Sequence, residues 1–139
     1  MLEYKTGTEV IDWGALMRLY VVTDGIVDLA KAGDLTSIQR AFRNSDRIVT
    51  AWDGDRLVGA GRMISDGVCY GWIHDMAVLP EYQQQGVGRG IVAALLEGNE
   101  HLLIGLRAAH DAVDFYQKLG FQRHETSFAK YPVEADRIG

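Results

Sequence analysis

The 139-residue sequence predicts an α/β (α+β) protein with a mixed, mainly antiparallel central sheet of six to seven strands and helices on both faces. Two observations support this fold class. Apolar segments at 47–52 and 56–64 flank the turn Asp53-Gly54-Asp55, a pattern typical of a β-hairpin. In the second half of the chain, helical patterns alternate with short apolar segments, as expected when helices cover a sheet.

Two helices are expected before the hairpin. Asp12 is a suitable N-cap for a helix that runs through Tyr20, because its carboxylate can accept hydrogen bonds from the free amides of the first turn. Asp34 or Thr36 starts a second helix that runs to Arg43.

The other expected elements follow from apolar patterning and from turn residues. They are strands at 2–6, 68–79, 102–106 and from 121 onward, and helices from 91 to about 98 and at 110–119. The segment 102–106 is wholly apolar, which favours a buried strand. Gly120 is placed to end the last helix.

The most informative segment lies between an apolar strand and a helix, and it reads Gln83-Gln84-Gln85-Gly86-Val87-Gly88-Arg89-Gly90. The first amides of a helix have no intrahelical partner and lie at the positive end of the helix dipole. Glycines there let an anion approach the backbone. This segment therefore predicts a phosphate-binding turn. It lacks the Lys-Ser/Thr pair of a P-loop, and G-x-G-x-G is not the spacing of a Rossmann turn.

The pattern Q-x-x-G-x-G, formed by Gln83, Gly86 and Gly88, resembles the acetyl-CoA loop of the GNAT superfamily of N-acetyltransferases. A second segment, 112–121, resembles the A-x-x-F-Y-x-K-x-G-F signature near the end of these enzymes. The resemblance covers about residues 47–128. It implies the GNAT fold, acetyl-CoA as the co-substrate and an amine as the acceptor.

The resemblance also assigns the acetyl-CoA contacts. The pyrophosphate would bind the loop, whose residues are Gln83, Gln84, Gln85, Gly86, Val87, Gly88, Arg89 and Gly90. The pantetheine arm would pair with the backbone of the preceding strand at Met76, Ala77 and Val78, and a backbone N–H there could also stabilise the oxyanion. Family members often have Asn where this chain has Ala109, so one hydrogen bond to coenzyme A is expected to be missing or supplied by water.

Tyr116 is the candidate acid for the departing thiolate, because the resemblance places it beside the sulfur of coenzyme A. A phenol can donate to a developing thiolate. The alternative is a structural role: Tyr116 shares a helical stripe with Ala109, Ala112, Val113 and Leu119, and such stripes usually face a core.

His74 and Asp75 are the candidate bases. An imidazole titrates near neutral pH, and His74 matches a catalytic histidine of arylalkylamine N-acetyltransferases, to which this segment is similar. Trp72 replaces the first of their two strand histidines. Strand alternation places His74 and Asp75 on opposite faces unless a bulge changes the register. Both candidates stay open, and so does ordered water, which the resemblance to other family members allows.

Together these features predict one acetyltransferase domain, 1–139, that transfers an acetyl group from acetyl-CoA to a primary amine by direct attack. The alternatives are a non-catalytic acyl-CoA-binding module and a protein N-acetyltransferase. The net charge of −5 argues against nucleic acid as a partner. A single cysteine, no apolar stretch of membrane-spanning length and no secretory signal predict a cytoplasmic protein. No metal site is expected, and a homodimer is consistent with family behaviour.

Overall fold

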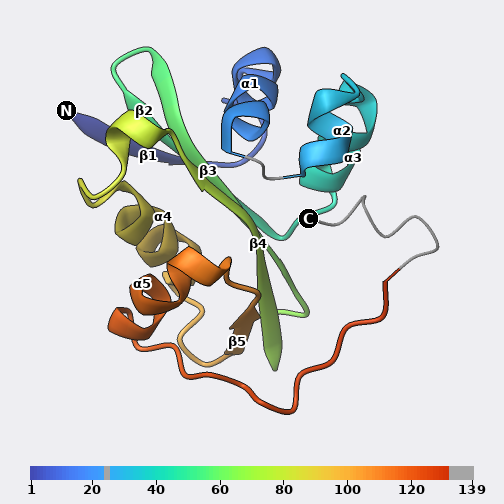
Figure 1. Cartoon of the computed structure of the whole chain (residues 1–139), viewed down its shortest axis with the longest axis vertical. Helices are drawn as coiled ribbons and strands as arrows, with labels where there is room; N and C mark the ends of the chain where they lie inside the picture. Colours follow the sequence, from blue (N-terminus) through green and yellow to red (C-terminus); the bar gives the residue numbers. More distant parts are fainter. Residues whose placement is uncertain (24–25, 132–139) are drawn as a thin grey trace.

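The computed structural model describes residues 1–23 and 26–131, and its centre is a five-stranded sheet with the order β1-β2-β3-β4-β5 (Figure 1). Neighbouring strands from β1 to β4 are antiparallel, whereas β5 lies parallel to β4. The strands are β1 (Leu2–Thr6), β2 (Arg47–Asp53), β3 (Arg56–Ser65), β4 (Tyr70–Val78) and β5 (Leu103–Leu106). The mixed, mainly antiparallel sheet is thus confirmed.

Helices cover both faces of this sheet, as the sequence predicts (Figure 1). One face carries α1 (Trp13–Thr23), α2 (Val27–Lys31) and α3 (Leu35–Arg43). The other carries α4 (Val87–Leu96) and α5 (Val113–Lys118), and two short 3-10 turns, η1 (Pro80–Tyr82) and η2 (His110–Ala112), precede these helices.

The predicted helix caps are confirmed. The Asp12 carboxylate accepts a hydrogen bond of 3.1 Å from the amide of Ala15, and the Asp34 carboxylate accepts one of 3.1 Å from the amide of Ser37. Each bond satisfies an amide that the first helical turn leaves free. Asp34, rather than Thr36, therefore begins α3.

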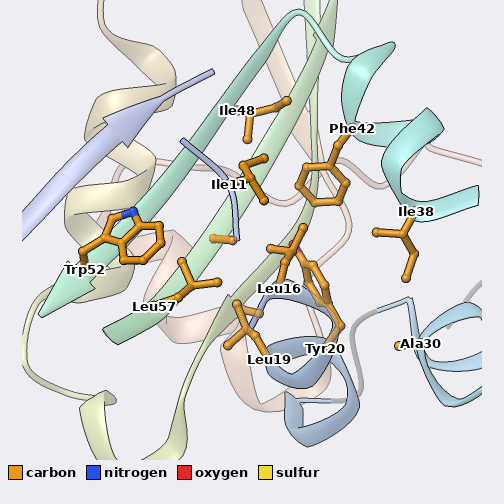
Figure 2. Packing of buried hydrophobic residues seen from close by; sticks show 12 residues of the cluster. Ile11, Leu16, Leu19, Tyr20, Ala30, Ile38, Phe42, Ile48, Trp52 and Leu57 are labelled. Atoms are coloured by element: carbon orange, nitrogen blue, oxygen red, sulfur yellow. The ribbon is translucent and has the colours of Figure 1, made fainter. Parts of the chain in front are cut away.

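Two apolar cores stabilise the fold, one on each face of the sheet. The first packs Leu16, Leu19 and Tyr20 of α1 and Phe42 of α3 against the sheet (Figure 2). The second packs the buried side of α4 against the opposite face of the same strands, and its members include Val49, Val58, Met63, Ile91 and Leu95. Each fully buried side chain of this size contributes about 1.5–3 kcal/mol.

The prediction of six to seven strands is wrong, because the described residues form five. The strand expected from Phe121 onward is absent within 121–131. This segment is polar from Gln122 to Ser127, and a backbone hydrogen bond of 3.3 Å from the Ser127 amide to the His124 carbonyl oxygen closes a turn inside it. A short polar segment interrupted by a turn offers little apolar surface with which to extend a sheet.

Two smaller expectations also need correction. The helix α2, a single short helix between α1 and α3, was not predicted from the sequence. Leu103 in β5 is 56% exposed rather than buried. Ile104 packs against the core under α4, so alternation turns Leu103 to the opposite face. The remaining parts of the predicted domain, residues 24–25 and 132–139, lie outside the described residues.

Candidate active site

The loop between η1 and α4 has the features of an anion site. Gly86 is the N-cap of α4, with a left-handed φ of 85° and no side-chain cap, and Gln84 also has a positive φ of 64°. The amides from Gln84 to Arg89 donate no hydrogen bond to any part of the chain that the structure describes. A run of free amides at the positive end of a helix is well suited to a phosphate group.

Two glutamine side chains hold this loop in place by hydrogen bonds to backbone carbonyl oxygens. The Gln83 amide group donates to the carbonyl oxygen of Val78 at 3.1 Å, and that of Gln85 donates to the carbonyl oxygen of Glu81 at 2.8 Å. Both glutamines therefore fasten the loop to its own backbone and leave its main-chain amides unoccupied.

The three loop glycines have different roles. A side chain at Gly86 would meet nothing within 4 Å, so this glycine is required by its positive φ and leaves open space beside the backbone. A Cβ at Gly88 would lie 3.0 Å from the ring of Phe115, and one at Gly90 would collide with Tyr4. Gly88 and Gly90 thus allow the close packing of α4 against α5 and β1, in addition to any role in ligand access.

The strand that leads to this loop contains a bulge at Asp75. Ala60 pairs with Ala77 but Arg62 pairs with His74, so β4 contains one more residue than β3 between these pairs. Asp75 has a φ of 57°, in the left-handed region. The bulge shifts the alternation by one residue.

This shift decides which side chains share a face. Arg62 lies over Phe42, on the face covered by α1 to α3, and its register partner His74 lies on the same face. Because the Asp75 carboxylate binds Arg62, it too lies on that face. Beyond the bulge, Met76 contacts the opposite core under α4. The bulge therefore brings the two candidate bases together, where simple alternation predicts opposite faces.

The pairing of β4 with β5 ends next to these residues, and the unpaired stretch beyond it is called the gap between β4 and β5. The two strands pair from Tyr70 with Leu103 to Ile73 with Leu106, and the pairing ends there. From His74 onward, the β5 side of β4 has no strand partner among the described residues. The backbone edge of Met76, Ala77 and Val78 thus lies between the gap and the anion loop.

Asp75 and His74 differ in electrostatic environment. The Arg62 Nε–H donates to the Asp75 carboxylate at 2.7 Å, and both side chains are less than 20% exposed. His74 is half-buried. Its burial and the nearby Arg62 guanidinium lower its pKa below the ordinary 6.5, and the opposing effect of Asp75 is smaller. His74 is therefore neutral at pH 7, whereas the Asp75 carboxylate is occupied by an ion pair.

Tyr116 projects from α5 on the other side of the sheet. It is 8% exposed and makes edge contacts with the rings of Phe115 and Phe121. Burial raises its pKa to about 12. Its hydroxyl donates to no other described residue, and the described residues contain no fully buried side-chain oxygen without a partner, so the hydroxyl oxygen is at least partly accessible. The structural role and the functional role of Tyr116 are thus compatible.

One cavity on the surface includes only part of the predicted site. It has a volume of about 970 Å³ and lies between β5, α5 and the chain beyond α5. Tyr116 and Trp72 line it, but the anion loop, His74 and Asp75 do not. The exposed phosphate loop and the unpaired edge of β4 therefore define the site better than this cavity does.

Sequence reasoning missed Arg62 and the role of Tyr20. The Tyr20 hydroxyl donates to the backbone carbonyl oxygen of Asp75 at 2.6 Å. An arginine in the interior of a strand, with apolar or glycine residues on both sides, is a signal that could have identified Arg62. The described residues contain no group of three or more His, Cys, Asp or Glu side chains placed to hold a metal ion. None of the described helices has the length and apolar character needed to cross a bilayer.

Comparison with known proteins now defines the class. The sequence pattern of the acetyltransferase (GNAT) domain matches residues 44–123. The structure superimposes on a GNAT-family acetyltransferase from Streptococcus pneumoniae with a TM-score of 0.80, at 26% identity over 96% of this chain and 100% of the other. The chain belongs to the GNAT family of acetyltransferases.

Curated relatives are similar over a shorter region. A chloroplastic GCN5-related N-acetyltransferase 2 from Arabidopsis thaliana is 36% identical over 96 residues, which is 63% of this chain and 37% of the relative. A histone acetyltransferase, TAP1, from Glycine max is 37% identical over 48% of this chain and 30% of its own length. The chain thus spans about a third of the length of these relatives.

Proposed function

We propose that this protein transfers an acetyl group from acetyl-CoA to a primary amine by direct attack of the amine on the thioester. The observation that carries the proposal is the run of free amides from Gln84 to Arg89, which lies at the N-terminus of α4 and follows the open edge of β4. The diphosphate of coenzyme A is the family ligand that fits such a run. Its pantetheine arm would then lie along Met76, Ala77 and Val78.

The two faces of the sheet separate the roles of the side chains. His74 lies on the α1–α3 face, where it would take a proton from an incoming amine. Tyr116 lies on the α4–α5 face, on the side of the anion loop. In the reaction, the amine nitrogen bonds to the acetyl carbon, the carbon–sulfur bond breaks, and the sulfur leaves as a thiolate. A backbone N–H of the β4 edge would stabilise the intermediate oxyanion.

The pKa of Tyr116 limits what this residue can do. A phenol of pKa about 12 is a weaker acid than a thiol, whose pKa is about 8.5. Complete proton transfer to the thiolate would be uphill by about 5 kcal/mol. Tyr116 therefore stabilises the departing sulfur as a hydrogen-bond donor, and the proton on the released thiol comes from solvent.

His74 is the better candidate for the base. The Asp75 carboxylate is bound at 2.7 Å by Arg62, so it would have to break an ion pair before accepting a proton. The lowered pKa of His74 leaves its imidazole unprotonated at neutral pH. Asp75 is then a neighbour that shapes the site without taking the proton.

Two measurements test this function. Isothermal titration calorimetry with coenzyme A and acetyl-CoA tests the anion loop, and a thiol-release assay with a panel of primary amines tests turnover. We expect binding of both and amine-dependent thiol release. Absence of binding heat at millimolar ligand would refute the proposal. Binding without thiol release for any amine or peptide would instead identify the non-catalytic acyl-CoA-binding alternative.

A further inference from the structure

The bulge in β4 is held in a conformation that its sequence does not favour. Asp75 has a φ of 57°, and residues other than glycine adopt this region at an energetic cost unless the surroundings fix them. As a bulge residue, Asp75 is also displaced from the regular ladder between β3 and β4. Contacts from outside the ladder must therefore keep it in place.

Tyr20 makes the first of these contacts. Its ring is fully buried between α1 and the sheet, beside Phe42 (Figure 2). Its hydroxyl donates to the backbone carbonyl oxygen of Asp75 at 2.6 Å. A buried hydroxyl needs a partner, and the displaced carbonyl needs a donor, so each satisfies the other.

Arg62 makes the second contact, to the side chain of Asp75. Its Nε lies 2.7 Å from the carboxylate, and its Nη1 donates to the hydroxyl of Ser45 at 3.2 Å. The guanidinium also lies over the ring of Phe42, 5.6 Å from its centroid. Three contacts fix the arginine, so Asp75 is held at its backbone from α1 and at its carboxylate from β3.

We propose that Tyr20 and Arg62 are positioning residues of the acyl-transfer site, which together hold Asp75 in the bulge and thereby place His74 at the mouth of the gap between β4 and β5. This inference rests on the proposed function. His74 is the first residue of β4 beyond the pairing with β5, and the bulge immediately follows it. Without the bulge, the side chains of Met76 and Val78 would turn to the face covered by α1 to α3.

The variants that test the proposal remove one contact at a time. Tyr20→Phe removes the hydroxyl and keeps the buried ring. Arg62→Lys keeps the positive charge but loses the planar fork that binds carboxylate and hydroxyl together, and Arg62→Gln removes the charge. The matched controls are Tyr70→Phe and Arg40→Gln, because both side chains are exposed and lie outside the site.

The first readout needs no activity. In the free protein, we expect Tyr20→Phe to accelerate hydrogen exchange of the amides from His74 to Val78 by about tenfold, since a lost hydrogen bond allows local opening. The amides of β2 should exchange at the wild-type rate. Tyr70→Phe should leave both regions unchanged. A purely structural role would instead accelerate exchange throughout the sheet.

The second readout is kinetic. We expect Tyr20→Phe and Arg62→Lys to lower kcat about tenfold with little change in KM for acetyl-CoA, because the anion loop is intact. Arg62→Gln should also shift the ascending limb of the pH dependence of kcat to higher pH. The charged groups that act on His74 are Arg62 of β3 and Asp75 of β4, while α1 contributes the neutral Tyr20.

Each outcome decides the proposal. Faster amide hydrogen exchange that is confined to β4, together with a lower kcat, supports the proposal. Folded Tyr20→Phe and Arg62→Lys proteins with wild-type exchange in β4 and wild-type kcat overturn it. A wild-type protein that acetylates no amine counts against the proposed function, whereas the exchange experiment still shows whether the two side chains hold the bulge.

Discussion

At the scale of single residues, the site depends on how neighbouring groups change the two candidate proton-transfer side chains. His74 is shifted toward the neutral form by burial and by Arg62, and Tyr116 is shifted toward the neutral form by burial alone. Both groups are therefore uncharged at pH 7, which is the form that their proposed roles require. The basic group can accept a proton, and the phenol can only donate a hydrogen bond.

The pH dependence of turnover tests His74. The pKa of His74 is below 6.5, so kcat should rise with pH, reach half its maximum below pH 6.5 and be constant at neutral pH. Tyr116, with a pKa of about 12, should cause no decline below about pH 10. His74→Gln should abolish the ascending limb and lower kcat about a hundredfold. If the limb persists in His74→Gln, another group is the base.

Tyr116→Phe tests the donor to sulfur. Loss of this hydrogen bond should lower kcat by about one to two orders of magnitude, because the bond strengthens as charge develops on the sulfur. The dissociation constant of acetyl-CoA should change less than about threefold. Stopped-flow thiol release and calorimetry measure the two quantities. Equal rates for Tyr116→Phe and wild type would leave Tyr116 as a core residue only.

At the scale of elements, the anion loop combines two kinds of glycine. Gly86 adopts a backbone conformation that other residues avoid, whereas Gly88 and Gly90 allow close packing against Phe115 and Tyr4. The glycine-rich pattern therefore serves both ligand access and the docking of α4. A functional motif and a packing motif occupy the same few residues.

Gly86→Ala tests the loop. The positive φ of 85° makes any side chain strained by about 1 kcal/mol, so the loop should distort and coenzyme A should bind about five- to tenfold more weakly. Gly7→Ala is the matched control, because Gly7 has a φ of 92° and equally open surroundings. Both variants should lose similar thermal stability, but only Gly86→Ala should lose affinity. Equal affinities in calorimetry would argue against the loop as the phosphate site.

At the scale of the whole molecule, one sheet separates two cores and two kinds of chemistry. The helices α1 to α3 cover the face with His74, and α4 and α5 cover the face nearest the anion loop (Figure 1). The gap between β4 and β5 is the place where groups on the two faces can meet. The possible homodimer and the cytoplasmic location stay predictions.

Alkaline pH tests how strongly the fold depends on buried phenols. Burial, followed by the nearby Asp75, raises the pKa of Tyr20 well above 10, and burial raises that of Tyr116 to about 12. In the unfolded chain both would ionise near pH 10. Their contribution to stability is therefore complete below pH 10 and is lost as the pH rises from 10 toward 12. Urea unfolding should show this decline, and Tyr116→Phe should reduce it. A free energy of unfolding that stays constant up to pH 11 would contradict the raised pKa values.

The sequence by itself determined the local features: the hairpin, the cap Asp12, the glycine that ends the last helix and the turn that precedes α4. These depend on interactions between residues near one another in the chain. The acetyltransferase resemblance also depends on contiguous motifs. The family that these motifs predict is confirmed, because the pattern of the acetyltransferase (GNAT) domain matches residues 44–123.

Only the tertiary structure decided the arrangement of the site. The bulge at Asp75, its contacts with Tyr20 and Arg62, and the end of pairing between β4 and β5 join residues far apart in sequence. The position of a bulge is set by what the neighbouring strand and helices can satisfy, and no local pattern in β4 encodes those partners. The absence of a sixth strand within 121–131 has a similar cause, because an edge strand forms only where tertiary packing rewards it.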